Sequence, residues 1–210
     1  MKTICEYLEE DRLKWPDHPY IHIKENGIYR PRTFLEVTDD IQNMAKALLA
    51  RGFQGKNLII FAENSYEWIV LSFAVMAYVG VCVPVDKEWT SYDLKNTFCV
   101  LPAAAVFYSR SRADRVSSLK EPYPDTAWFC IEDAFAGLIQ EGSQVQAELT
   151  GTRDPRKTVL TLFTSGTTNL PKAIPLTQEN LFANWKTLYR RTPMMETDRS
   201  CVFLPLHHVY

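Results

Sequence analysis

Residues 164–172 concentrate the side chains of this chain that could bind an anion. They read TSGTTNLPK, with four hydroxyl groups, one glycine and one lysine in nine residues, directly after an apolar run at residues 159–163. Hydroxyl and backbone N–H groups can donate to phosphate oxygens, glycine allows a close backbone approach, and the lysine ammonium neutralises charge. This composition fits a polyphosphate site. An ordinary surface turn rich in serine and threonine has the same composition, so the residues alone leave both interpretations open.

The glycine spacing excludes one common phosphate-binding loop. Counted from Gly166, a Walker A element needs glycine at residue 171 and a hydroxyl at residue 173, where the chain has Pro171 and Ala173. The stretch instead resembles the phosphate-loop signature of the AMP-forming adenylating enzymes, roughly [ST]-S-G-[ST]-T-G-x-P-K-G. That superfamily includes acyl-CoA synthetases, luciferases and peptide-synthetase adenylation domains. Asn169 and Ala173 replace two of its glycines, and asparagine tolerates a positive φ better than most residues.

The resemblance implies a reaction and a set of binding residues. ATP and a carboxylate form an acyl-adenylate and pyrophosphate, and the thiol of CoA then takes the acyl group. Magnesium and Lys172 would assist the hydroxyl groups in holding the β- and γ-phosphates. The nucleotide-binding residues implied are Thr164, Ser165, Gly166, Thr167, Thr168 and Lys172.

A second segment, LPLHH at residues 204–208, resembles the next motif of the same superfamily. That motif ends in a histidine beside the acyl carboxylate, which makes His208 the expected catalytic and substrate-binding residue and His207 its neighbour in the acyl site. A structural histidine at the end of a strand is the alternative. The spelling is closest to bacterial fatty acyl-CoA ligases, although luciferase-like members also carry paired histidines. The pair has apolar neighbours: Val202, Phe203, Leu206 and Val209. They suit a medium- or long-chain fatty acid, or they form plain strand core and carry no information about the substrate.

The pattern of apolar segments predicts the fold. Strands without polar residues at 58–62, 104–108 and 128–131 alternate with helical patterns, which is typical of an α/β protein with a largely parallel sheet flanked by helices. This is the expected N-terminal portion of the large domain of the adenylating enzymes. Ligands bind such sheets at the carboxyl ends of the strands, where the hydroxyl-rich loop falls.

Short polar signals set the expected boundaries of the elements. Asn26-Gly27 predicts a hairpin turn, Thr33 begins a capping box, and Asn64 is the expected cap of the next helix. Thr177 is the expected cap of a later helix with an inward apolar stripe, formed by Leu181, Trp185 and Leu188. A short helix is expected at residues 134–139, a surface connection at 141–157 and one more strand at 200–204.

The composition indicates which kinds of partner this protein could bind and in which compartment it lies. A formal net charge of −2 and the lack of a basic stripe argue against nucleic-acid binding. Five cysteines without a C-x-x-C spacing indicate reduced, mostly buried thiols in a cytoplasmic protein, and the spacing of the four histidines indicates no metal site. Residues 68–85 carry no charge, but Gly80 and Pro84 interrupt them, which favours a buried helix followed by a strand over a membrane span. Peripheral contact with a membrane is left open.

The chain stops in an apolar run after the second motif, which indicates a truncation. Residues 1–210 then form the N-terminal part of the AMP-binding domain, ending after the histidine-containing strand and without a C-terminal domain. The resemblance places the adenine and ribose contacts and a catalytic lysine beyond Tyr210, so we expect the fragment alone to be inactive. Two alternatives stay open: an adenylation domain that loads a carrier protein, and a non-catalytic nucleotide-binding module. The oligomeric state is not readable from the sequence.

Overall fold

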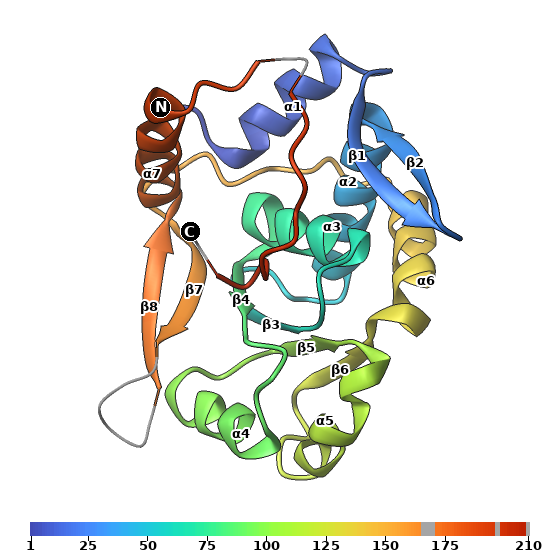
Figure 1. Ribbon diagram of the computed structural model, residues 1–210. Coiled ribbons are helices and arrows are strands. Elements are labelled where there is room, and N and C mark those ends of the chain that lie inside the picture. Colours follow the sequence, from blue (N-terminus) through green and yellow to red (C-terminus); the bar gives the residue numbers. More distant parts are fainter. Residues whose placement is uncertain (165–170, 196–197, 209–210) are drawn as a thin grey trace.

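The computed structural model describes residues 1–164, 171–195 and 198–208 and is built around a six-stranded sheet (Figure 1). The strand order is β6-β5-β3-β4-β7-β8, and among the described residues every neighbouring pair is parallel except β7 and β8. The bounds are β3 Asn57–Phe61, β4 Val81–Pro84, β5 Ala105–Tyr108, β6 Ala127–Cys130, β7 Thr158–Thr164 and β8 Lys172–Thr177. The predicted α/β class with a largely parallel sheet is confirmed.

Helices cover both faces of the sheet (Figure 1). The face formed by Leu58 and Ile60 of β3 packs under α1, α2, α3 and α6, and the face formed by Ile59 and Phe61 packs under α4 and α5. Because both faces are buried, β3 contains no polar residue after Asn57. The bounds of the helices are α1 Ile4–Lys14, α2 Phe34–Ala50, α3 Tyr66–Ala74, α4 Ser91–Val100, α5 Ala113–Lys120, α6 Ile131–Gln144 and α7 Gln178–Arg191.

The signals at the start of the chain are confirmed. The strands β1 (Pro19–Glu25) and β2 (Ile28–Thr33) pair antiparallel across a turn in which Asn26 and Gly27 have φ values of 51° and 84°. The capping box of α2 forms as predicted, since the Glu36 amide donates to Thr33 Oγ1 at 3.2 Å and the Thr33 amide donates to the Glu36 carboxylate at 2.8 Å.

The uncharged stretch at residues 68–85 lies inside the protein, as predicted. The helix α3 continues into a π-helical turn, Val75–Val79, and Gly80 then leads into β4. Among the described residues, no helix has both the length and the apolar character needed to cross a membrane.

Two elements differ from expectation at the end of the chain. Thr177 caps α7 as predicted, but Trp185 and Leu188 are 47% and 49% exposed, so the stripe points inward only near Leu181. The reason is that α7 follows the outermost strand, β8, and lies beyond the end of that strand at the edge of the molecule (Figure 1). The predicted strand at residues 200–204 is also wrong, because this extended segment pairs with no strand of the described chain and leaves Phe203 78% exposed.

The cysteines are free thiols, but they are not mostly buried. Cys5 and Cys82 are buried, and burial raises the pKa of the Cys82 thiol. Cys99 and Cys201 are exposed, and Cys130 is half-buried.

Gln178 joins three distant parts of the chain. Its side chain is fully buried, and its Oε1 accepts from the backbone amide of Ile4 at 2.7 Å. Its Nε2 donates to the carbonyl oxygens of Thr152 and Asp154 at 3.2 and 3.4 Å. The first helix therefore depends on a residue at the start of the last one.

The helix α6 is longer than predicted and packs closely on α2. It runs to Gln144, so Gly142 lies inside a helix and is buried, whereas the sequence placed it in a surface connection. A Cβ atom at Gly142 would lie 1.8 Å from the carbonyl oxygen of Asn43 in α2. Only glycine permits this approach of the two backbones.

We predict that Gly142→Ala destabilises the protein, because the two helices must move apart to admit the methyl group. The loss should be on the order of 1–3 kcal/mol in the free energy of unfolding, measured by urea denaturation. Gly137→Ala in the same helix is the matched control, since a Cβ there meets nothing within 4 Å. This control should be neutral or stabilise by up to about 1 kcal/mol. Equal effects of both substitutions would contradict the proposed helix contact.

Candidate active site

The carboxyl ends of the parallel strands bring several polar segments to one edge of the sheet. Glu63 and Asn64 follow β3, Asp86 follows β4, and Thr164 ends β7. The strands β4 and β7 are neighbours with Cys82 opposite Leu160, and Asp86 and Thr164 each lie four residues beyond that pair. The segments that carry these side chains therefore leave the sheet side by side.

Thr164 and Lys172 flank the predicted phosphate-binding loop. They are directly opposite each other at the end of the antiparallel ladder of β7 and β8, and both are exposed. Side chains directly opposite on such a ladder lie on the same face. A hydroxyl and an ammonium group therefore lie together at the entrance to the loop. The other predicted nucleotide-binding residues, Ser165, Gly166, Thr167 and Thr168, lie outside the described residues.

The side chain of Asn64 holds the segment that carries the two histidines. Its Nδ2 donates to the carbonyl oxygen of Leu204 at 2.7 Å, and its Oδ1 accepts from the amide of Leu206 at 2.9 Å. The expected role of Asn64 as a helix cap is therefore wrong. Ser65 caps α3 instead, because its hydroxyl accepts from the amide of Trp68.

His207 and His208 differ in exposure although their rings are adjacent. The ring centroids are 4.3 Å apart, but His207 is only 9% exposed, whereas His208 lies on the exposed side. His207 Nε2 lies 3.6 Å from Asp86 Oδ1. Burial lowers the pKa of His207, and Asp86 opposes this shift. The structure thus places both predicted histidines next to the end of β4.

The apolar surroundings expected of the histidine pair are only partly present. Leu206 packs against the main core, but Val202 and Phe203 are 57% and 78% exposed. Val209 lies outside the described residues. The neighbourhood of the histidines therefore gives no geometric support for an alkyl-chain pocket.

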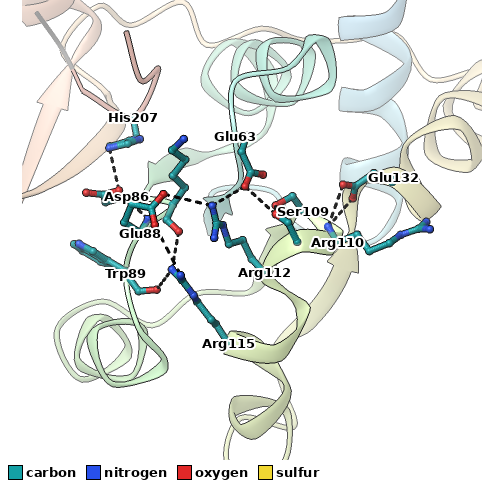
Figure 2. A network of polar contacts seen from close by, with 12 residues as sticks. Glu63, Asp86, Glu88, Trp89, Ser109, Arg110, Arg112, Arg115, Glu132 and His207 are labelled. Atoms are coloured by element: carbon teal, nitrogen blue, oxygen red, sulfur yellow. Dashed lines mark hydrogen bonds and ion pairs between the residues drawn. The ribbon is translucent and has the colours of Figure 1, made fainter. Parts of the chain in front are cut away.

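A network of charged side chains fixes the loops that follow β3, β4 and β5 (Figure 2). Arg112 Nη2 lies 2.8 Å from Glu63 and 3.5 Å from Glu88, and the side chain of Arg112 is only 15% exposed. Arg115 Nη1 donates to the carbonyl oxygens of Lys87 and Trp89 at 2.9 and 2.8 Å. The two arginines therefore hold both sides of the segment that begins at Asp86.

An aromatic contact connects this segment to the start of the predicted phosphate-binding loop. The ring centroids of Trp89 and Phe163 are 5.8 Å apart, and Phe163 directly precedes Thr164. The described part of the candidate site thus extends from the histidines through Asp86 to the end of β7.

Sequence reasoning missed the residues that support the site. Glu63, Asp86, Arg112 and Arg115 belong to no motif that names them. Only the position of two of them in the sequence could have indicated a role, because Glu63 and Asp86 are the first acidic residues after two continuous apolar strands. Such positions lie at the ligand-binding edge of a parallel sheet.

The comparisons with known proteins agree with this architecture. Residues 8–210 match the family described as AMP-binding enzyme. The chain belongs to the AMP-binding enzyme family. A relative of this AMP-binding enzyme is the long-chain-fatty-acid–CoA ligase FadD15 of Mycobacterium tuberculosis, with 30% identity over 92% of this chain and 34% of the relative. Another is the Arabidopsis thaliana long-chain-fatty-acid–[acyl-carrier-protein] ligase AEE15, with 23% identity over 85% of this chain and 28% of the relative.

A solved structure shows the same fold. The N-terminal domain of FACL13 from Mycobacterium tuberculosis, determined with a bound inhibitor, aligns with a TM-score of 0.84 and 19% identity. The alignment covers 99% of this chain and 52% of that one. The chain spans about a third of the length of the FadD15 relatives that it matches.

We predict that Asn64→Ala loosens the segment at residues 204–206. Loss of a hydrogen bond worth about 1 kcal/mol should lower the protection of the Leu206 amide against hydrogen exchange about fivefold. Asn64→Asp keeps the oxygen that accepts from that amide but loses the Nδ2 donor to Leu204, so it should retain more of this protection than the alanine variant. Unchanged protection in the alanine variant would show that other contacts hold the segment.

We predict that Glu63 makes stability depend on pH in the acid range. Burial alone would raise its pKa, but hydrogen bonds from Ser109, Ser111 and its own amide, with the charge of Arg112, lower the pKa from 4.5 to about 2. Because the folded state holds the proton less tightly, this stabilisation is full above pH 4.5 and is lost as the pH falls towards 2.

Urea denaturation across this range should show Glu63→Gln less stable than the parent above pH 4.5, with the difference disappearing near pH 2. Glu148→Gln, at an exposed carboxylate, is the control and should leave the pH dependence unchanged. A difference that does not vary with pH would contradict the assigned cause.

Proposed function

We propose that the whole protein activates a carboxylic acid with ATP and transfers the acyl group to CoA. In the first step a carboxylate oxygen attacks the α-phosphorus of ATP, and pyrophosphate leaves. In the second step the sulfur of CoA attacks the carbonyl carbon of the acyl-adenylate, and AMP leaves. Residues 1–210 would supply the N-terminal part of the AMP-binding domain, and this part alone would be inactive.

The observation that carries the proposal is the pairing of Thr164 and Lys172 at the base of the hydroxyl-rich loop, in a chain of the AMP-binding enzyme family. We assign the β- and γ-phosphates to the hydroxyls of this loop and to the Lys172 ammonium. Their donor set suits a polyphosphate, and magnesium bound to ATP would neutralise further charge. The nucleotide-binding residues proposed are Thr164, Ser165, Gly166, Thr167, Thr168 and Lys172.

We assign the carboxyl group of the acid to His208, with His207 beside it. The exposure of His208, on the ligand-binding edge of the sheet, supports this role. In the adenylation step the residues of this chain would mainly position the two reactants, because the phosphates and carboxylate are all negative and repel each other unless held.

We propose a medium- or long-chain fatty acid as the substrate. This proposal is supported by the names of the two relatives reported above. Both are named for long-chain fatty acids, but they are named for different acceptors: CoA and an acyl-carrier protein. A carrier protein is therefore the alternative acceptor for the same chemistry. We also propose a cytoplasmic location, which the free thiols support.

The decisive experiment is carboxylate-dependent exchange of pyrophosphate into ATP by the whole protein. Acetate, octanoate, palmitate and a panel of amino acids would be compared, and we expect the longer aliphatic acids to give the highest kcat/KM. Lys172→Ala should lower the exchange rate about 30-fold, because a charge-assisted contact to phosphate is worth about 2 kcal/mol. Thioester formation from preformed acyl-adenylate should change far less, since pyrophosphate has already left.

Lys157→Ala is the matched control for Lys172→Ala. Lys157 is an exposed lysine that precedes the opposite end of β7, so its loss should leave exchange unchanged. Equal losses in both half-reactions would assign Lys172 to the fold or to a domain motion. Absence of exchange with any acid would favour a non-catalytic nucleotide-binding module, and a preference for acetate or an amino acid would contradict the substrate assignment.

A further inference from the structure

Asp86, His207 and His208 bring three potential metal ligands together. One ligand atom from each lies within 4.8 Å of the other two. The measured separation of His207 Nε2 and Asp86 Oδ1 is 3.6 Å. Two ligand atoms bound tetrahedrally to one zinc ion lie about 3.4 Å apart. The group therefore needs only small side-chain adjustments to hold an ion, although the spacing of histidines in the sequence gives no sign of it.

The state of His207 independently indicates a missing partner. Its Nε2 is shielded from solvent and makes no hydrogen bond with any described residue. Buried polar atoms of proteins are nearly always paired, so an orphaned nitrogen facing a carboxylate requires an explanation.

Both halves of this ligand group are held in place by other parts of the fold. Arg115 holds the carbonyl oxygens of Lys87 and Trp89, just after Asp86 (Figure 2). Asn64 holds the amide of Leu206, directly before His207. The Asp86 carboxylate is itself oriented, because its Oδ1 accepts from the amide of Glu88 at 2.9 Å. Preorganised ligands lose little conformational entropy when an ion binds.

We propose that Asp86, His207 and His208 form a binding site for a first-row transition-metal dication, with zinc as the ion that fits best. Two imidazoles and one carboxylate match the ligands that zinc accepts, and a fourth position stays open to water or an external carboxylate. Magnesium, which demands six oxygen ligands in octahedral geometry, does not fit this set. Lys87 also lowers the pKa of His207, so its positive charge opposes the ion and Asp86 is the ligand that offsets it.

The site has a consequence that rests on the proposed function. An ion bound to His208 removes that imidazole from the acyl carboxylate, so zinc inhibits adenylation. Metal binding itself does not depend on this role, and it is measured in the absence of ATP and acid.

The test is calorimetric titration of the metal-free whole protein with zinc, together with the visible absorption spectrum of the cobalt form. We expect binding at this site that excess magnesium does not displace. Asp86→Asn and His208→Gln should each weaken this binding at least about tenfold. The asparagine retains the oxygen that accepts from Glu88, and His208 is exposed, so both variants should fold.

His22→Ala is the matched control, because His22 is an exposed histidine on the distant hairpin strand β1. It should bind zinc as the parent does. The proposal is overturned if the parent binds no zinc, or if the Asp86 and His208 variants bind it as tightly as the parent. Either result leaves the pyrophosphate exchange assay unaffected, so failure of this inference and failure of the proposed function are distinguishable.

Discussion

The burial of the central strands on both faces determines where this protein can place polar groups. Ile59 and Ile60 are fully buried on opposite sides of the same strand, and their neighbours in β4 and β5 are buried as well. An ionised side chain in the middle of such a strand would lose its hydration without gaining a partner. In β3, β4 and β5, charged and hydrogen-bonding side chains are therefore confined to the ends of the strands. The carboxyl edge collects them because five parallel strands of the described sheet end there together.

Loops at such an edge need support, and here arginine supplies it. Arg112 and Arg115 lie at the start of one short helical region, yet they reach the segments after β3 and β4. The low exposure of Arg112 matters, because charge pairs that are shielded from water interact more strongly than exposed ones. Planar guanidinium groups can contact two acceptors at once, which a lysine ammonium does with less directional control. The network thus converts separate strand ends into one connected surface.

The sequence correctly predicted those features that depend on interactions between residues close together in the chain. The caps at Thr33 and Thr177 and the turn at Asn26 and Gly27 depend on residues within three or four positions, and all three formed as predicted. Asn64 satisfied the same local rule, yet its amide pairs with residues 204 and 206 because Ser65 supplies the cap.

The other wrong predictions also concern residues whose structure depends on contacts with distant parts of the chain. Gly142 is buried because α2 lies against it, and residues 200–204 form no strand because an apolar extended segment needs a neighbouring ladder. The approach of Asp86 to His207 likewise depends on the three-dimensional fold, so the spacing of histidines alone could not reveal it.

Gln178 imposes an order on the folding of this protein, because α1 can dock completely only after Gln178 has been synthesised. The amide of Ile4 and the carbonyl oxygen of Thr152 are satisfied by a side chain that lies 174 residues after the first of them. During synthesis the ribosome delivers α1 long before it delivers Gln178. The helix α1 therefore lacks its hydrogen bond to Gln178 while the strands of the central sheet are synthesised. Because closing so long a loop is slow, the nascent chain exposes the apolar side of α1 at least until Gln178 has been synthesised, and this side can bind chaperones.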